Sequence, residues 1–506
     1  MSTRQTDDLT QISTLGALRE SGYAARSVKD EMRANLIRKL RAGEPVFPGV
    51  LGFDETVIPQ LQNAILGRHD FILLGLRGQA KSRLLRMLPT LLDEFVPAIA
   101  GTDLNDDPFN PLSKRAREIV AEHGDETPIR WLTRDERYGE KLATPDTSIA
   151  DLIGDIDPIK AATQKLTYAD EEVIHFGIIP RLNRGIFGIN ELPDLQPRIQ
   201  VGLLNIMEET DIQIRGFNVR IPLDIVMVFT ANPEDYTNRG SIITPLKDRI
   251  DSQIITHYPK TIDLGVQITQ QEAWQDRDGD VDVIVPHFFR ETIEQIAFEA
   301  RKSEYIDQKS GVSVRLTRSA LENLLSAAER RALVNGEAET TVRISDLTHV
   351  EPAITGKVEL VYEGEQEGAQ NVARLLIGRA VKSIFLNYFP DPSQKGDGRQ
   401  PYAKVLAWFA SGNRVDLSTN LPFDAYVRAL DQVDGLLDVA KRFSKPDGPA
   451  ETASMMELVL EGLHQHSLLG KDLLESDVKY SDLMGSMFSS FSPPEDDDEE
   501  DEDWYR

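Results

Sequence analysis

Phe71-Ile-Leu-Leu-Gly-Leu-Arg-Gly-Gln-Ala-Lys-Ser82 joins a run of apolar residues to a glycine-rich turn that closes with lysine and serine. Gly75 and Gly78 give the backbone room to turn its amides inward. Those amides, together with the N-terminus of the following helix, form a cradle for anionic phosphates. Lys81 is then expected to reach the β- and γ-phosphates, and Ser82 to ligate Mg²⁺. The segment therefore predicts a phosphate-binding loop in which Gly75, Gly78, Gln79, Ala80, Lys81 and Ser82 hold the ligand.

One residue of this loop departs from the consensus G-x-x-x-x-G-K-[ST], because Ala80 stands where the last glycine is expected. The context supports the motif nonetheless. Residues 83–92 after the loop are apolar at helical spacing, so that a strand precedes the turn and a helix follows it.

The composition restricts the class of protein. The chain has 506 residues, no cysteine and a formal net charge of −27, to which the acidic run Glu495–Asp503 contributes −9. Without cysteine, the chain has neither disulfides nor thiolate metal sites. The acidic charge disfavours a broad nucleic-acid surface, and no run reaches the length of a membrane span. We expect a cytoplasmic protein whose acidic tail is disordered.

Three further apolar runs read as buried parallel strands, since each is short and continuous and is followed by polar residues. They are Gly185–Ile189, Ile225–Phe229 and Gln253–Ile255. Helical patterns separate them, which predicts an α/β fold with a parallel sheet. Residues 211–215 and 218–221 alternate around Gly216 and predict a hairpin, whereas residues 101–165 read as an insertion of loops and short helices.

Polar residues follow two of these strands at the edge where open α/β sheets bind ligands. Asn190 and Glu191 end the second strand, where a nucleotide hydrolase usually carries Asp-Glu. Glu191 would polarise the attacking water, and the uncharged Asn190 would order the hydration shell of Mg²⁺ less strongly than an aspartate. Asn232 ends the third strand and could sense the γ-phosphate or orient the water, although Asn before Pro is also an ordinary turn former. Two later arginines, Arg249 and Arg315, would by themselves read as surface residues.

Taken together, the chain resembles the AAA+ ATPases of the helix-2-insert group, in particular subunit I of magnesium chelatase, and next the MoxR ATPases. The resemblance covers about residues 47–350. Besides the loop and Asn190-Glu191, it rests on Phe47-Pro-Gly-Val-Leu-Gly52, Asp107-Pro-Phe-Asn-Pro111, Ile153-Gly-Asp-Ile-Asp157, residues 176–186, Met207-Glu-Glu209, Ala231-Asn-Pro-Glu234 and Leu246-Lys-Asp-Arg-Ile250.

The resemblance implies that Asn232 is sensor 1, Arg249 the arginine finger and Arg315 sensor 2. It also implies ATP and Mg²⁺ as cofactors, a ring oligomer, commonly a hexamer, and a separate partner that carries a von Willebrand A domain. Within the part that the resemblance covers, we expect an AAA+ α/β nucleotide-binding domain (47–285) and an α-helical lid (286–350). The residue pattern outside it predicts a helical N-terminal extension (1–46), a mainly helical C-terminal region (351–490) and the acidic tail (491–506).

Several functions stay open at this point. The first is a ring-forming ATPase that remodels a partner protein, similar to magnesium chelatase subunit I or to a MoxR chaperone. The second is a nucleotide-gated scaffold that hydrolyses ATP slowly because of Asn190. An activator of sigma-54 polymerase is disfavoured, since no Gly-Ala-Phe-Thr-Gly-Ala loop and no basic helix-turn-helix are present.

Overall fold

The computed structural model describes residues 10–157, 159, 163, 171–209, 211–213, 220–233, 241–277, 279, 281–394, 397–474 and 477–483. The predicted acidic tail (491–506) lies outside these residues. The chain divides into two compact units, Met1–Tyr258 and Pro259–Arg506. The domain boundaries given above stay predictions.

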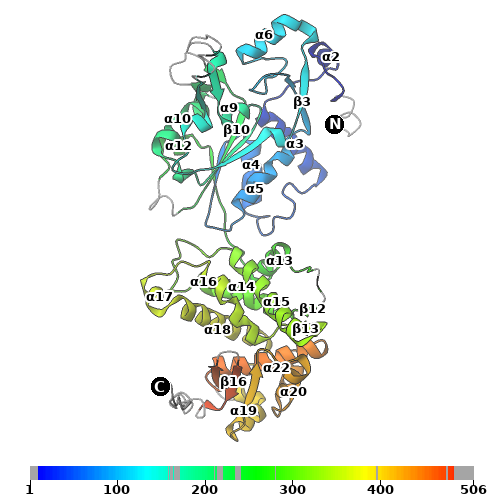
Figure 1. Ribbon diagram of the computed structural model, residues 1–506, viewed down its shortest axis with the longest axis vertical. Coiled ribbons are helices and arrows are strands. Elements are labelled where there is room, and N and C mark those ends of the chain that lie inside the picture. Colours follow the sequence, from blue (N-terminus) through cyan, green and yellow to red (C-terminus); the bar gives the residue numbers. More distant parts are fainter. Residues whose placement is uncertain are drawn as a thin grey trace, which may run out of the picture. The chain divides into compact units, whose positions relative to one another are not determined.

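The first unit is built on a five-stranded sheet (Figure 1). Its strands are β1 (Phe71–Leu74), β4 (Tyr138–Leu142), β7 (Gly185–Asn190), β10 (Ile225–Ala231) and β11 (Ser252–Ile255). They lie in the order β11-β1-β10-β7-β4, and all neighbours are parallel. The predicted fold class, a P-loop AAA+ α/β core followed by a mainly helical region, is confirmed, as are the four predicted strands.

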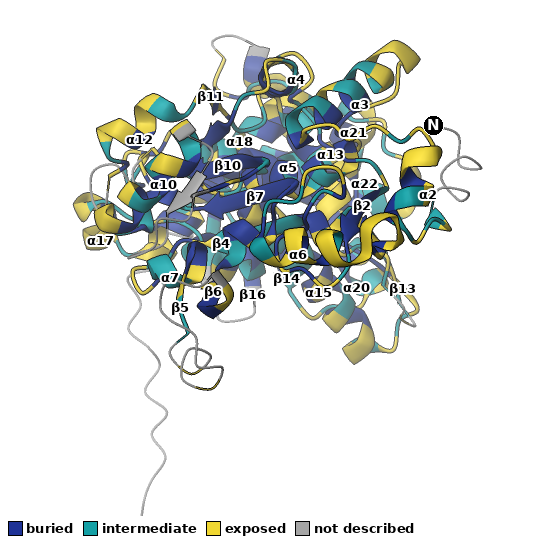
Figure 2. Ribbon diagram, turned by 90° about the horizontal axis from the view of Figure 1, so that it is seen from above, coloured by how far each residue is buried: buried dark blue, intermediate teal, exposed yellow. Residues whose placement is uncertain are grey.

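The sheet is buried on both faces, which explains why its central strands are apolar throughout. Figure 2 shows β7 and β10 as buried, in keeping with their side chains. Phe71 and Leu73 pack in one cluster with α3 (Val28–Ala42), α4 (Val57–Leu66) and α5 (Lys81–Met87). Ile72 and Leu74 pack in the other, with α9 (Ile178–Arg181), α10 (Pro197–Glu209) and α12 (Thr244–Arg249).

Strand β4 corrects the prediction of loops and short helices for residues 101–165. It lies at the edge of the sheet and pairs with β7, so that Leu142 is opposite Asn190. Its residues Tyr-Gly-Glu-Lys-Leu are intermediate or exposed. An edge strand needs no continuous apolar run, and the sequence pattern therefore missed it.

The predicted N-terminal helix over Val28–Leu40 forms as α3 and is part of the first core. Ser27 caps its first turn, and Gly43 ends it in the left-handed conformation. The Val28 amide donates to both carboxylate oxygens of Asp224, at 3.0 and 2.9 Å. Since α3 contributes buried residues beside β1, this part of the predicted extension packs as a layer of the α/β unit.

Short elements complete the first unit. The predicted hairpin forms as β8 (Asp211–Gln213) and β9 (Arg220–Pro222), which pair antiparallel. Two more antiparallel pairs were not predicted, β2 (Phe95–Ile99) with β3 (Ile129–Thr133) and β5 (Gly154–Ile156) with β6 (Ile174–Phe176). The remaining helices are α2 (Leu15–Glu20), α6 (Lys114–His123) and α7 (Ile149–Leu152), with the 3₁₀ turns η1 (Leu88–Leu91), η2 (Gly124–Glu126), η3 (Asp135–Arg137), η4 (Glu171–Val173) and η5 (Leu192–Asp194).

The second unit is mainly helical around one hydrophobic core. Its helices are α13 (Ile262–Glu272), α14 (His287–Ala300), α15 (Arg315–Asn335), α16 (Glu351–Thr355), α17 (Tyr362–Glu367), α18 (Ala369–Tyr388), α19 (Ala403–Ala410), α20 (Phe423–Asp431), α21 (Leu436–Phe443) and α22 (Gly448–Gln465), with η6 (Ile344–Val350) and η7 (Asp397–Tyr402). Its strands are β12 (Asp282–Ile284), β13 (Glu339–Thr341), β14 (Val415–Ser418), β15 (Gly470–Leu474) and β16 (Asp477–Ser481). Because β13 pairs with β12, the segment 286–350 is not wholly helical as predicted.

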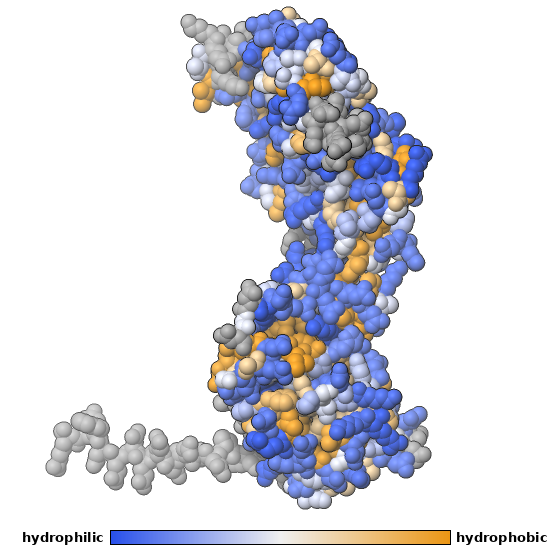
Figure 3. All heavy atoms as spheres, turned by 90° about the vertical axis from the view of Figure 1, so that its right-hand side faces the viewer, coloured by the Kyte–Doolittle hydropathy of each residue, from blue (hydrophilic) through white to orange (hydrophobic). Residues whose placement is uncertain are grey.

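Hydrophilic residues dominate the face seen in Figure 3, and apolar residues gather there in separate patches. Within the described ranges, no helix is both long enough and apolar enough to cross a membrane.

Candidate nucleotide-binding site

The loop between β1 and α5 carries two residues in the left-handed conformation. Gly78 has φ +76°, which is available to glycine at little steric cost. Ala80, the N-cap of α5, has φ 56° and ψ 12°. The backbone therefore keeps the conformation that a glycine would adopt at this position of the consensus, and the alanine side chain is placed at a steric cost of roughly 1–2 kcal/mol.

Contacts from the segment directly after β11 hold this loop in place. A Cβ atom on Gly75 would overlap the Thr256 hydroxyl and the Gln79 carboxamide. The Thr256 hydroxyl donates to Gln79 Oε1 at 2.8 Å, and the Tyr258 hydroxyl donates to the Arg77 carbonyl at 3.0 Å. Glycine at position 75 is thus needed for packing, and Gln79 fixes the loop rather than pointing away from it. The sequence analysis missed Thr256, which comes directly after β11.

Lys81 is buried and turns back over the loop. Its ammonium group donates to the carbonyls of Gly75 and Leu76, the second at 3.1 Å, and to Asn232 Oδ1 at 2.6 Å. The Asn232 amide in turn donates to Glu191 Oε2 at 3.1 Å. The structure therefore brings three predicted site residues, from the ends of β1, β10 and β7, into one hydrogen-bonded series.

A second set of contacts lies beside the first. Ser82 Oγ donates to Asn190 Oδ1 at 3.4 Å, and Thr230 Oγ1 donates to the same oxygen at 3.2 Å. Thr230 also accepts from the Glu191 amide at 3.1 Å. Glu191 itself has φ 56°, an uncommon conformation for a residue other than glycine, and this conformation follows directly after β7. Thr230 was not singled out from the sequence because its position within an apolar strand reads as core.

The loop with its lysine, Asn232 and Glu191 are among the residues on which the sequence resemblance rests, and the structure brings them together at one edge of the parallel sheet. The chain resembles the AAA+ ATPases. No family model matches the chain. It is 29% identical over 169 residues to the archaeal Lon protease of Thermococcus kodakarensis, and this match spans 30% of the chain and 25% of that protease.

Two solved structures illustrate the similarity in fold. A model of the complex of subunits BchI and BchD of magnesium chelatase contains a chain with 18% identity and a TM-score of 0.34, covering 64% of this chain and 99% of that one. NtrX from Brucella abortus in complex with ADP has 13% identity and a TM-score of 0.35, covering 79% and 72%. Similarity at this level carries no argument about activity, and function is therefore argued from the geometry of the loop and the strand ends.

Ser82 and Asn190, the two residues predicted to hold Mg²⁺, are both uncharged. Across the described residues, no group of three or more His, Asp or Glu side chains could hold a metal ion. Ser82 and Asn190 offer a hydroxyl and an amide oxygen, the hard donors that Mg²⁺ takes, but they carry no charge. Such a pair suits Mg²⁺ that arrives with phosphates, because the phosphate oxygens supply the missing charge. The residues present fit a nucleotide-borne Mg²⁺ rather than a free ion.

The two arginines to which the resemblance assigns roles belong to different units. Arg249, the last residue of α12, pairs with Glu208 on α10, with Nε 2.8 Å from Oε2, and its Nη1 donates to the Pro245 carbonyl at 2.9 Å. Arg315 is exposed at the first residue of α15 in the second unit. Their roles stay predictions.

A charged cluster beside Asn190 was missed by the sequence analysis. Glu140 on β4 accepts from Arg86 on α5 at 2.5–3.2 Å and from the Tyr138 hydroxyl at 2.9 Å. Hydrogen bonds from Arg86, and further ones from Tyr138 and Asn190, hold the pKa of this carboxyl below its usual range. The residue was missed because its strand was read as a loop.

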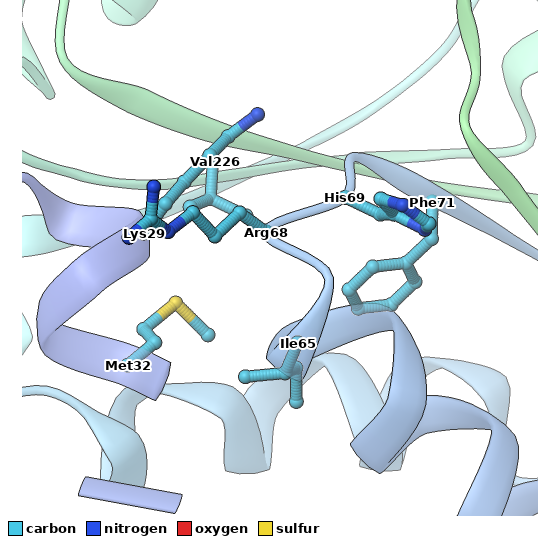
Figure 4. A pocket seen from close by; sticks show the side chains of 7 residues that line it. All are labelled: Lys29, Met32, Ile65, Arg68, His69, Phe71 and Val226. Atoms are coloured by element: carbon cyan, nitrogen blue, oxygen red, sulfur yellow. The ribbon is translucent and has the colours of Figure 1, made fainter. Parts of the chain in front are cut away.

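A small pocket lies at the other end of the strands. Figure 4 shows Lys29, Met32, Ile65, Arg68, His69, Phe71 and Val226 around it. Its basic groups already have partners: Lys29 contacts Asp70 at 2.8 Å, Arg68 pairs with Asp30, and His69 contacts Ser252 at 2.7 Å. Phe71 begins β1 and Val226 is near the start of β10, whereas the phosphate loop follows the end of β1. The pocket is therefore separate from the candidate nucleotide-binding site.

Proposed function

We propose that this chain binds ATP with Mg²⁺ and hydrolyses it as a ring-forming AAA+ ATPase that remodels a partner protein. The observation that carries the proposal is the series Lys81–Asn232–Glu191, which joins a phosphate loop to a carboxylate at the carboxyl ends of three neighbouring strands. This edge is where open α/β sheets bind ligands.

Lys81 and the loop would bind the phosphates. The ammonium group is held by neutral oxygens, and a phosphate oxygen would be a stronger acceptor for it because charge-assisted hydrogen bonds are about twice as strong as neutral ones. Ser82 and Asn190 would hold Mg²⁺, which neutralises charge on the transferred phosphoryl group.

Glu191 would polarise the attacking water. Its carboxylate is held by Asn232, whose other end is bonded to Lys81. If Lys81 bound a phosphate instead, Asn232 Oδ1 would be free to accept a hydrogen bond from a water molecule. The general-base and sensor positions are thus linked through one amide.

Binding and turnover test this proposal directly. Lys81→Ala should weaken binding of a fluorescent ATP analogue roughly 10- to 100-fold, since one charge-assisted contact is worth about 1.5–3 kcal/mol. Glu191→Gln should bind with nearly wild-type affinity and lose hydrolysis. Lys404→Ala removes an exposed lysine of the second unit and serves as the control. Wild-type binding no tighter than that of Lys81→Ala would overturn the proposal.

Arg249 is proposed to complete the site of a neighbouring subunit. An arginine supplied in trans raises the rate of phosphoryl transfer by about 10³ to 10⁵. A subunit with Arg249→Ala still has its phosphate loop and Glu191, and a subunit with Glu191→Gln still has Arg249. A mixed oligomer of the two inactive variants would therefore contain some complete sites, and mixing should restore part of the activity. Mixtures as inactive as either variant alone would contradict a shared site.

Arg315 is proposed as sensor 2, and Arg315→Ala should lower the rate of ATP hydrolysis more than the affinity for ATP.

The partner is proposed to be a protein with a von Willebrand A domain. Glu191→Gln held with ATP would retain the partner, which mass spectrometry of captured material identifies. Recovery of magnesium- or cobalt-chelatase components would narrow the function to metal insertion, whereas a von Willebrand A protein of another kind would favour a MoxR-type chaperone.

The neutral Asn190 favours one alternative, a nucleotide-gated scaffold that binds ATP and hydrolyses it slowly. Steady-state hydrolysis separates the two functions. A wild-type rate equal to that of Lys81→Ala, with ATP binding intact, would support the scaffold.

A further inference from the structure

The chain leaves the first unit at Tyr258, shortly after the end of β11. We call residues 256–258 the junction segment. Two of its side chains contact the phosphate loop: the Thr256 hydroxyl donates to Gln79 Oε1 at 2.8 Å, and the Tyr258 hydroxyl donates to the Arg77 carbonyl at 3.0 Å. The phosphate loop is therefore hydrogen-bonded to the segment that leads into the second unit.

The contact with Arg77 fixes the direction of a loop amide. A trans peptide is planar, so its N–H points away from its C=O. The Arg77 carbonyl faces Tyr258, and the Gly78 amide of the same trans peptide therefore points away from the junction segment. Gly78 has φ +76°, and because glycine adopts both signs of φ readily, the peptide before it could rotate at little cost. The Tyr258 hydroxyl opposes this rotation and so preserves the direction of the amide.

The Thr256 hydroxyl holds the loop at a second point. Thr256 and Gln79 are both buried, and they enclose Gly75, where an added Cβ atom would overlap both side chains. The Thr256 amide also donates to the Leu74 carbonyl at 2.7 Å, which continues the pairing between β1 and β11. Removing the hydroxyl would take away the donor that holds the Gln79 carboxamide beside Gly75.

The junction segment has little conformational freedom of its own. His257 contacts the Thr56 hydroxyl through Nε2 and the Tyr258 carbonyl through Nδ1, both at 2.8 Å. Pro259 fixes its own φ and restricts the residue before it to extended conformations. Since Thr261 caps α13, only two residues separate Tyr258 from the capped helix of the second unit. A displacement of Tyr258 would therefore displace the start of α13.

We propose that Thr256 and Tyr258 are positioning residues that hold the phosphate loop in the conformation that binds its ligand, and that occupancy of the loop in turn fixes the segment leading into the second unit. The second part follows from the first because linkage is reciprocal: contacts that favour the ligand-bound loop are themselves favoured by the ligand. The proposal rests on the proposed function, since it concerns the phosphates of ATP. It goes beyond the resemblance, which assigned no role to either residue.

Binding of a non-hydrolysable fluorescent ATP analogue tests the positioning role. Tyr258→Phe removes one hydroxyl and keeps the ring, and should weaken binding roughly 3- to 10-fold, the effect of losing one neutral hydrogen bond. Thr256→Val should weaken binding by a similar factor, whereas Thr256→Ser keeps the hydroxyl and should bind nearly as tightly as wild type. Tyr362→Phe is the matched control, because Tyr362 is exposed on α17 and its hydroxyl accepts from Gln366 of the same helix at 2.9 Å.

Hydrogen exchange read by mass spectrometry tests the link to the second unit. With saturating analogue, wild-type peptides that span residues 256–264 should exchange roughly 3- to 10-fold more slowly than without it, the same factor as the effect on binding. This slowing should fall below about twofold in Tyr258→Phe at concentrations of the analogue that saturate the variant. A purely structural loss would instead speed exchange equally with and without the analogue, and would leave the nucleotide-dependent difference unchanged.

The outcomes of the two measurements are distinguishable. Wild-type affinity in Tyr258→Phe or in Thr256→Val would overturn the role of that residue, and so for Thr256 would a Thr256→Ser variant that binds as weakly as Thr256→Val. A nucleotide-dependent slowing that Tyr258→Phe leaves unchanged would overturn the link to the second unit. Each of these results, obtained with a wild type that binds the analogue, leaves the proposed function standing, whereas a wild type that binds no nucleotide overturns both.

Discussion

Removing the charge of Glu31 should loosen the first unit strongly, because this residue forms a buried ion pair between α3 and the start of β4. Arg137 donates from Nη1 to Glu31 Oε1 at 2.8 Å and from Nη2 to Oε2 at 2.6 Å. The side chains are 1% and 3% exposed, respectively. Glu31→Gln removes the carboxylate that both terminal nitrogens of the buried guanidinium contact, and breaking a buried pair in this way costs about 3–5 kcal/mol.

Hydrogen exchange read by mass spectrometry is the suitable assay, since the chain has two compact units and a single unfolding transition is not assured. Peptides from α3 and β4 should lose protection by a factor on the order of 10² to 10³, because each 1.4 kcal/mol is a factor of ten. Asp125→Asn is the control. It breaks an ion pair in which the side chain of Arg19 is 54% exposed and that of Asp125 is 68% exposed. The free energy of opening should change by less than about 1 kcal/mol, which is less than about fivefold in protection.

A second comparison tests the physical reason. Replacing both Glu31 and Arg137 by methionine removes the two charges together, and should destabilise less than Glu31→Gln alone. The reasoning is refuted by a loss below about 1 kcal/mol for Glu31→Gln, or by a double variant that is less stable than either single change.

Three more results are expected. Asn190→Asp should tighten the dependence of ATP hydrolysis on Mg²⁺ or raise its rate in a steady-state assay, and an unchanged or abolished rate would show that Asn190 is not at the metal position. Burial raises the pKa of Asp224 to about 6, against a hydrogen bond from Val28. Because the folded state then holds the proton more tightly than the unfolded state, the free energy of unfolding of the wild type should fall as the pH rises from about 4 to 7, by up to about 3 kcal/mol relative to that of Asp224→Asn. Free energies from urea unfolding that change with pH in parallel for the two proteins would contradict this. Ala80→Gly should raise the free energy of unfolding by up to about 1 kcal/mol and Ala80→Val should lower it, since the position is left-handed; the reverse order in urea unfolding would contradict the strain.

Most of the fold of the first unit was predictable because its inner strands are buried on both faces. Such strands must be apolar throughout, and the segments that contain Phe71, Ile186, Val228 and Ile254 show this directly. The edge strand β4 needs no such run, and it was not predicted because its glutamate and lysine interrupt the apolar pattern. Antiparallel pairs such as β2 with β3 were not predicted, because the two paired strands are distant in sequence.

The site was predictable where its residues follow one another in the chain. Lys81 and Ser82 belong to a local motif, and Glu191 follows the end of a strand that the pattern identified. Thr230 and Glu140 belong to the site only through the register of the sheet, which brings them beside Asn190. No spacing along the chain encodes that register, so these contacts required the structure.

The position of Lys81 has a consequence for which molecules can occupy the loop. Its ammonium group is already satisfied by two backbone carbonyls and by Asn232. A ligand therefore gains only the difference between its own contacts and those that it displaces. On the proposed function, a neutral or weakly charged group would gain little from this exchange, whereas a triphosphate would gain much. We therefore expect these contacts of Lys81 to favour ligands that carry several negative charges.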